Sequence, residues 1–306
     1  MKRRDFIKTG LTAGLAAGAG FSLLPYQKMM ARNAPVQNYD LAAIKGGSPV
    51  QMFDRGMKAM GGMGRFVKKG QTVVVKPNIG WSVPPERAAN TNPDLVKRII
   101  QHCYQAGAKV VYVFDNTCDN WIKAYQESGI EKAAKEANAK VAPGNSERYY
   151  HEVSIPGAKV LKSTKVHELI LESDVFINVP ILKHHGSADL TIAIKNLMGV
   201  IWDRRYWHRN DLHQCIADYG LFHKRPHLNV VDAYRVLMKN GPRGISINDV
   251  QLFQSQIIAP DMVAADSAAA ALFGKKADEI KYITIADEMK IGTKDLTKLK
   301  IARLNI

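Results

Sequence analysis

Short apolar runs alternate with amphipathic stretches along most of this chain, a pattern that is typical of an α/β fold. The β-branched run Thr72–Val75 predicts a strand, and Lys109–Phe114 predicts a second one. Between them, apolar residues recur at i, i+3, i+4 and i+7 from Val96, which predicts a helix that Asn92 caps and Gly107 ends. Strand, helix and strand in this order form a βαβ unit, so the two strands should be parallel.

The pattern continues to the C-terminus with further strands and helices. Asp174–Val179 is almost entirely apolar, as expected of a strand that is buried on both faces. The other expected elements are strands at 139–142, 228–231 and 250–254, helices at 121–138, 166–172 and 261–272, a Met-rich helix near 52–63, an irregular segment at 144–163, and a short helix and a last strand within 279–306. We therefore predict a mainly parallel sheet with helices on both faces, in three layers, within a single α/β domain at 35–306.

The first 34 residues are interpreted as an export signal of the twin-arginine type. Arg3 and Arg4 are adjacent, Phe6 follows two places on, and a Gly- and Ala-rich apolar stretch extends from Thr9 to Leu24. At roughly 16 residues this stretch is too short for a confident membrane span, although an uncleaved N-terminal anchor stays open. We expect a periplasmic protein that meets the membrane only through this N-terminus.

The net charge of +15 narrows the expected partners. Residues 1–34 hold six Lys or Arg and one Asp, so the rest of the chain remains basic without them. A basic surface fits an anionic ligand, an acidic partner protein or a membrane. The sequence contains no RNA-recognition motif and no zinc finger, so nucleic acid is not an expected partner.

Polar side chains follow the apolar strands at the points where these strands end. In open parallel sheets, ligands bind outside the carboxyl ends of the strands, so these side chains should line one site. They are Lys76 and Asn78 after the first strand, Asp115 and Asn116 after the second, Lys183, His184 and His185 beyond the third, and Asp232 after the fourth.

Lysines beside apolar strands indicate a cleft, because a buried lysine must be paired or face a cavity. Lys76, Lys183 and Lys195 are expected to bind phosphate or carboxylate groups as point charges, with Asn196 beside the last of them. A lysine can also form a Schiff base or another covalent link to a cofactor, whereas Lys195 can alternatively extend to solvent from a helix end. Arg243, in the tight turn 241–244, is a further candidate for binding an anion.

Four histidines are candidate ligands of a transition metal: His184, His185, His208 and His213. The first two are adjacent, so at most one of them normally points into a given site. Aspartates 115 and 232 are suited to completing a mixed nitrogen and oxygen shell or to orienting a histidine. The spacing does not identify a metal, and the cofactor stays open.

Several reaction classes are disfavoured by missing motifs. The three cysteines, Cys103, Cys118 and Cys215, form no CxxC pair, so neither an intrinsic iron–sulfur cluster nor a zinc knuckle is expected. No GxGxxG, Walker A loop or nucleophile elbow occurs. These absences argue against a Rossmann dinucleotide enzyme, a P-loop NTPase and an α/β hydrolase.

A set of short motifs extends over roughly residues 70–295: KPN at 76–78, TNPD at 91–94, SDVFINVPILKHH at 173–185, IKNLMG at 194–199, NVVDA at 229–233, NGPRG at 240–244 and DMVAAD at 261–266. Together they resemble domain-of-unknown-function family 362. The resemblance implies an association with iron–sulfur proteins, because many members of the family carry an added ferredoxin module. It also implies a distant relation to the nickel-pincer lactate racemases, whose cofactor is tethered to a lysine and whose nickel is held partly by histidine. The KHH run at 183–185 and Lys195 suggest that layout.

Two functional hypotheses follow. The first is an exported, metal- or cofactor-dependent redox or isomerase-type enzyme that acts on a small anionic substrate. The second is a non-catalytic periplasmic protein that binds a ligand or assists an iron–sulfur redox partner. In the first hypothesis the catalytic candidates are Lys183, His184, Lys195 and Asp232, and the binding candidates are Lys76, Asn78, Asp115, Asn196 and Arg243.

Overall fold

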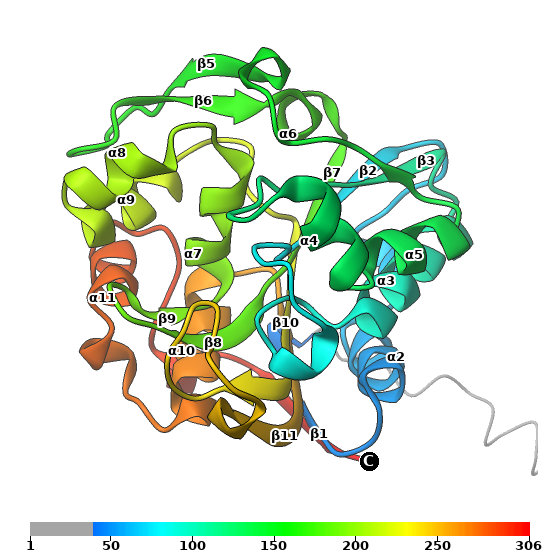
Figure 1. Cartoon of the computed structure of the whole chain (residues 1–306). Coiled ribbons are helices and arrows are strands. Elements are labelled where there is room, and N and C mark those ends of the chain that lie inside the picture. The colour runs from blue at the N-terminus through cyan, green and yellow to red at the C-terminus, as the bar shows by residue number, and fades with distance from the viewer. Residues whose placement is uncertain (1–38) are drawn as a thin grey trace, which may run out of the picture. The chain divides into compact units, whose positions relative to one another are not determined.

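A ten-stranded mixed sheet forms the centre of the computed structural model, which describes residues 39–306 (Figure 1). The strands are β1 (Leu41–Lys45), β2 (Thr72–Pro77), β3 (Val110–Val113), β4 (Lys140–Val141), β7 (Val175–Val179), β8 (Ile181–His185), β9 (Asp189–Thr191), β10 (Leu228–Leu237), β11 (Val250–Ala259) and β12 (Ile301–Asn305). Eight of them lie in the order β12-β1-β11-β10-β7-β2-β3-β4, while β8 pairs with β10 and β9 with β8. Neighbours in this order are parallel except where β11 meets β1 and β10.

Helices cover both faces of the sheet, as the three-layer prediction requires. The core on one face contains side chains of α2 (Pro49–Ala59), α3 (Pro93–Gln105), α4 (Trp121–Glu127) and α5 (Ile130–Glu136). The core on the other face contains side chains of α6 (Glu168–Glu172), α7 (Ala193–Asn196), α8 (Arg204–Arg209), α9 (Leu212–Tyr219), α10 (Met262–Phe273) and α11 (Lys281–Glu288). The side-chain alternation of a strand divides the central valines between these cores, with Val73 and Val75 on one face and Val74 on the other.

Helix α3 shows why the local patterns were informative. The side chain of Asn92 accepts the N–H groups of Asp94 and Leu95, and Pro93 occupies the first turn, as predicted. Gly107, just past the helix, has a φ of +94°, which favours glycine. The strands on either side of α3, β2 and β3, are parallel as expected of a βαβ unit.

Other elements differ from the predictions for identifiable reasons. The helix predicted at 121–138 is divided by Gly129, whose φ of +73° separates α4 from α5. The irregular segment predicted at 144–163 contains β5 (Tyr150–Ser154), which pairs with β6 (Ser163–His167), so the helix predicted from residue 166 begins only at Glu168. Strand β1 and helix α2 lie near the N-terminal end of the described chain. Helix α2 is the predicted Met-rich helix, and its Met52 and Met57 are buried.

Strand β8 has the largest consequence for function. Lys183, His184 and His185 were placed beyond the end of the third main strand, and after Pro180 residues 181–185 form a further strand beside β10. Strand β10 itself continues to Leu237 instead of ending before Asp232. Lys183 is therefore held inside the sheet, with 1% of its surface exposed.

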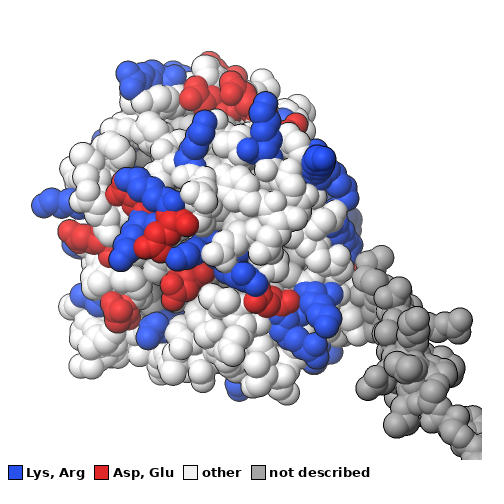
Figure 2. Space-filling view, turned by 90° about the vertical axis from the view of Figure 1, so that its right-hand side faces the viewer, with Lys and Arg blue, Asp and Glu red and all other residues white. Residues whose placement is uncertain are grey.

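The predictions about export and membrane contact concern mainly the N-terminal segment of the chain. The twin-arginine segment at 1–34 lies outside the described residues. Within residues 39–306, no helix has both the length and the apolar character needed to cross a bilayer. On the side of the molecule that carries α2, α3 and α5, basic and acidic side chains are interspersed (Figure 2).

Candidate functional site

A cavity of about 410 Å³ opens at the carboxyl ends of β2 and β3, against β8 and α7. We call it the lysine pocket, because Lys76, Lys183 and Lys195 all line it. Its other lining residues are Asn78, Gly80, Trp81, Asp115, Asn116, Cys118, His185, Thr191, Asn196, Met198, Gly199, Arg204, Arg205, His208 and Pro242. The structure thus brings Lys76, Asn78, Asp115 and Asn196 together around one cavity, at the edge of the sheet where the strand-end argument placed the first three.

Lys76 is held by an ion pair and an amide. Its Nζ lies 2.9 Å from Asp115 Oδ1 and donates a 2.9 Å hydrogen bond to Asn196 Oδ1. The other carboxylate oxygen of Asp115 accepts the N–H of Ile79 at 2.7 Å. Burial lowers the pKa of Lys76 and raises the pKa of Asp115, while the attraction between the two charges opposes both shifts.

A chain of asparagine side chains supports this wall of the pocket. Asn78 donates to Asn196 at 2.8 Å, Asn196 donates to Asn178 at 2.8 Å, and Asn178 donates to Asn229 at 3.0 Å. All but Asn78 are buried, so each amide satisfies a neighbour that would otherwise lack a hydrogen-bond partner. The chain connects the pocket to the interior of β7 and β10.

Gly199 gives the ion pair its space. A Cβ atom at this position would lie 1.9 Å from Asp115 Oδ1 and 2.6 Å from Lys76 Nζ, far inside van der Waals contact. The backbone also packs here, since the N–H of Asn116 donates to the carbonyl of Gly199 at 3.0 Å. A side chain larger than hydrogen would displace either Asp115 or the IKNLMG segment.

Lys183 has a different environment from Lys76. Its Nζ donates to Asn78 Oδ1 at 3.0 Å and to the carbonyl of Ala89 at 2.5 Å. Among residues 39–306, no carboxylate forms an ion pair with it. Burial lowers its pKa to about 7, because the charged ammonium loses its hydration without gaining a countercharge.

Lys195 is the least satisfied of the three lysines. Its Nζ contacts Met198 Sδ at 3.1 Å, which is a weak acceptor, and 7% of the residue is exposed. Within the part of the chain that the structure describes, it too has no carboxylate partner. Burial lowers its pKa to about 8. The pocket thus contains two lysines whose protonation can change near neutral pH.

The structure brings two of the four candidate histidines together and separates the other two from them. His185 and His208 line the lysine pocket with ring centroids 6.3 Å apart. His184 points instead to the turn at 241–244, where its Nδ1 accepts the N–H of Gly241 at 3.0 Å, and His213 stacks on Tyr282. In residues 39–306, no three His, Cys, Asp or Glu side chains are grouped so as to hold a metal ion.

A family comparison matches residues 73–271 to the family described as "Domain of unknown function (DUF362)". The matched segment covers more than half of the chain and includes all three lysines of the pocket together with Asp115. The chain belongs to family DUF362. The resemblance that the KPN, KHH and IKNLMG motifs indicated is therefore confirmed.

Relatives of this DUF362 chain include a thylakoid-associated protein of Synechocystis sp., 25% identical over 222 residues, which are 69% of this chain and 65% of that protein. Similar solved structures include the lactate racemase apoprotein of Thermoanaerobacterium thermosaccharolyticum, with 12% identity, a TM-score of 0.48, and coverage of 81% of this chain and 59% of that one. A Thermotoga maritima protein has 10% identity and a TM-score of 0.47, over 79% of this chain and 60% of that one. The chain thus spans less than two thirds of the length of each.

Besides His184, two further predicted site residues of the DUF362 motifs, Asp232 and Arg243, lie outside the pocket lining. Asp232 lies in the middle of β10, where its carboxylate accepts the backbone N–H groups of Asn92 and Tyr234. Burial raises its pKa to about 6. Arg243 is half exposed and lies 3.7 Å from Asp119, beside the pocket residue Pro242. The carboxylate of Asp232 therefore binds backbone N–H groups of the fold, and Arg243 lies beside the pocket without lining it.

The prediction also missed pocket residues that no motif singled out. Arg204 donates to the carbonyls of Asn116 and Thr117 at 2.8 and 2.5 Å, and to Cys118 Sγ at 3.2 Å. The cationic and aromatic run around Arg204 was visible in the sequence, but its contact with the end of β3 was not. Trp81 and Cys118 carried no signal because both lie in irregular segments.

Proposed function

We propose that this DUF362 protein is an exported enzyme that binds a small carboxylate or phosphate in the lysine pocket and transfers a proton to or from it. The observation that carries this proposal is the pair Lys183 and Lys195, which are buried in one cavity with no carboxylate partner among residues 39–306. The Arg3–Arg4 pair near the N-terminus supports the export step.

Anion binding follows from the charges that line the pocket. Four of its cationic side chains are Lys183, Lys195, Arg204 and Arg205. Asp115 is the one carboxylate in the lining, and it is already paired with Lys76. A bound carboxylate or phosphate would supply the countercharge that the protein itself does not provide. Pairing both lysines with this anion would offset part of the desolvation free energy that their burial costs.

The lowered pKa values of the two lysines support a role in acid–base catalysis. Lys183, at about 7, is divided between amine and ammonium at neutral pH, whereas Lys195, at about 8, is mostly charged. With two of its hydrogen-bonding positions directed at Asn78 and Ala89, neutral Lys183 retains a lone pair for a substrate proton. Lys195 would stabilise the negative charge that develops on the substrate.

A metal or a tethered cofactor is not required for this proposal. His185 and His208 are the two imidazoles in the pocket, and no third ligand of the usual kind stands beside them in residues 39–306. Burial and the neighbouring lysines lower the pKa of His185 to about 2, so it is neutral at physiological pH. It therefore suits hydrogen bonding to the ligand rather than additional anion attraction.

The alternative is a binding protein without catalysis, which uses the same cations to hold a ligand or to dock with a redox partner. Exchange of substrate hydrogen for solvent deuterium separates the two functions. The exported protein would be incubated in D₂O with glycerate, lactate or malate, and loss of the Cα proton signal would be followed by NMR. Binding of each acid would be measured on the same samples by calorimetry.

We expect exchange with at least one of these acids, and its rate should fall roughly 10²–10⁴-fold in Lys183→Met, the range for losing a general acid–base group. Lys195→Met should weaken binding as well as exchange. Lys132→Met, which removes a lysine with 82% of its side chain exposed, should change neither. Binding without exchange would favour the non-catalytic alternative, and an absence of binding by any of the acids would contradict the proposal.

A further inference from the structure

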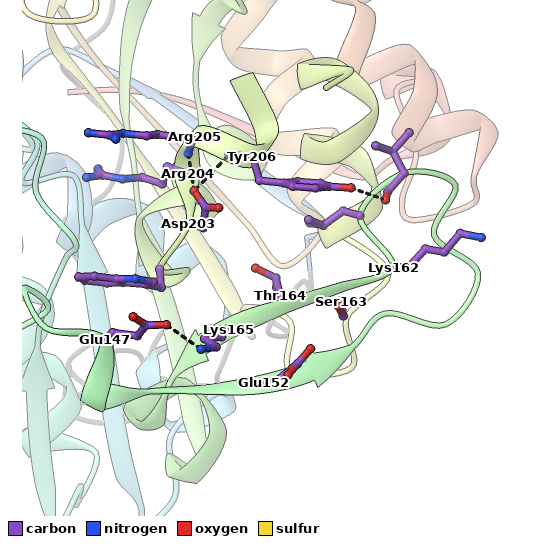
Figure 3. A pocket seen from close by; sticks show the side chains of 13 residues that line it. Glu147, Glu152, Lys162, Ser163, Thr164, Lys165, Asp203, Arg204, Arg205 and Tyr206 are labelled. Carbon is purple, nitrogen blue, oxygen red and sulfur yellow. Dashed lines mark hydrogen bonds and ion pairs between the residues drawn. The ribbon is translucent and has the colours of Figure 1, made fainter. Parts of the chain in front are cut away.

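A second, wider cavity opens beside the lysine pocket. It has a volume of about 980 Å³ and lies between β6 with its preceding loop on one side and the start of α8 on the other (Figure 3). We call it the β6 groove. Neither the family motifs nor the predicted site includes it, since its walls come from the hairpin β5–β6 and from the run at 202–206.

The two cavities adjoin at a pair of arginines. Arg204 and Arg205 line both of them. Arg204 is held in place by the carbonyls of Asn116 and Thr117, so its guanidinium marks a defined boundary between the cavities. Arg204 and Arg205 are thus the side chains that a ligand occupying both cavities would contact in each of them.

The charges in the groove differ from those in the lysine pocket. Lys165 forms an ion pair with Glu147 at 2.6 Å, and a further carboxylate, Glu152, stands nearby on β5 (Figure 3). Asp203 accepts the N–H groups of Arg205 and Tyr206 at the start of α8. Four cationic and three anionic side chains line the groove, so its excess is a single positive charge, whereas the lysine pocket has five cationic side chains and one carboxylate.

The remaining lining suits a hydroxylated molecule. The hydroxyls of Ser163 and Thr164 lie on β6, and Tyr206, with 40% of its surface exposed, reaches from α8 to the carbonyl of Val160 at 3.4 Å (Figure 3). Trp202 adds a half-buried indole whose ring lies 5.4 Å from that of Tyr150. A sugar ring offers donors and acceptors to the polar groups and an apolar face to an indole.

We propose that the β6 groove binds a neutral, sugar-like extension of the substrate, so that the substrate is a carboxylate bearing a hydroxylated ring. This inference rests on the proposed function for the placement of the carboxylate. The groove holds the extension, Arg204 and Arg205 lie at the junction, and the lysine pocket holds the acidic end.

Three probes test this assignment by calorimetry on the folded exported protein. Glycerate is a short hydroxy acid, lactobionate is a sugar acid that carries a galactosyl group, and lactose is a neutral disaccharide. Lactobionate should bind at least tenfold more tightly than glycerate. In Trp202→Ala and in Tyr206→Ala this advantage should fall below threefold, while glycerate affinity stays the same.

Tyr234→Ala is the matched control, because this half-buried tyrosine lines neither cavity. Equal affinities for lactobionate and glycerate in the unsubstituted protein would overturn the inference, as would an advantage that survives both groove variants. If neither acid binds, the proposed function fails. In that case lactose tests the sugar site by itself. Lactose binding that is lost in Trp202→Ala would support a sugar site in the groove, whereas an absence of lactose binding would overturn the sugar site as well.

Discussion

The two walls of the lysine pocket hold the same residue type at similar burial but with different partners. The paired wall consists of Lys76, Asp115 and Asn196, and the unpaired wall consists of Lys183 and Lys195. Lys76, Lys183 and Lys195 are 0%, 1% and 7% exposed. Of the three, Lys76 alone has a carboxylate of residues 39–306 in contact, at 2.9 Å, while burial lowers the pKa values of Lys183 and Lys195 to about 7 and 8.

The comparison shows that burial alone does not determine what a lysine contributes. Desolvation lowers the pKa of all three lysines, and a partner at contact distance decides how much of the charge is retained. The paired wall is therefore suited to holding the geometry of the site. The unpaired wall stores unfavourable free energy that a ligand can release, as is common where function and stability conflict.

The largest expected effect comes from breaking the paired wall. Asp115→Ala would leave Lys76 buried without its countercharge and the N–H of Ile79 without its acceptor. Removing one partner of a buried ion pair typically costs about 3–5 kcal/mol of unfolding free energy. Urea denaturation of both proteins at pH 7 measures this difference directly.

Asp119→Ala provides the control for that measurement. Asp119 is 25% exposed in its side chain, lies 3.7 Å from Arg243 and accepts the N–H of Ser82 at 3.0 Å, so its loss should cost about 1–2 kcal/mol, less than the loss of Asp115. If Asp115→Ala is as mild as Asp119→Ala, the ion pair does not stabilise the fold, and the distinction between the two walls is lost.

The sequence placed Lys76 and Asp115 at one edge of the sheet because the signals for both positions are local, although it did not predict their ion pair. KPN follows a β-branched strand, Asp115 follows the next one, and the helix between them is set by Asn92 and an apolar stripe. A strand, a helix and a second parallel strand bring two strand ends to one edge whatever the rest of the chain does. Lys76 and Asp115 could therefore be placed together without knowledge of any distant contact.

The unpaired wall was harder to predict because it depends on long-range pairing. Lys183 is positioned by β8, which pairs with β9 and with β10. Strand β9 follows β8 closely in the chain, but β10 is far from it in the sequence. The adjacent histidines looked like ligands, yet strand alternation turns His184 toward Gly241 and His185 toward the pocket. Arg204 and the β6 groove depend on tertiary contacts that leave no periodic pattern in the sequence.

A substitution in the unpaired wall should have the opposite sign to one in the paired wall. Lys183→Met keeps the volume and removes a charge that the fold desolvates, so the unfolding free energy at pH 6 should rise by about 1–4 kcal/mol, as when other buried charges are replaced by apolar side chains. Loss of the hydrogen bonds to Asn78 and Ala89 offsets part of this gain. Proton transfer should be lost in the same variant.

The pH dependence of the unfolding free energy identifies the cause of this stabilisation. The unfolded chain holds the Lys183 proton up to its ordinary pKa of 10.5, whereas the folded protein releases it near 7. Between these values the unfolded state binds more protons, so this lysine makes the unsubstituted protein more stable as the pH rises. The advantage of Lys183→Met should therefore shrink from pH 6 to pH 10, and a constant advantage would show that packing rather than charge is responsible.

The smallest expected effect sharpens the role of the paired wall. In Gly199→Ala the new methyl would meet Asp115 Oδ1 at 1.9 Å, so the backbone or the ion pair must move, at a cost of about 1–3 kcal/mol. Gly64→Ala is the matched control, because a Cβ there meets nothing within 4 Å and its φ is not positive. Because the methyl also lies 2.6 Å from Lys76 Nζ, Gly199→Ala should weaken glycerate binding while leaving the pH dependence of Lys183 in place. A variant that loses that pH dependence as well would show that the two walls act as one unit.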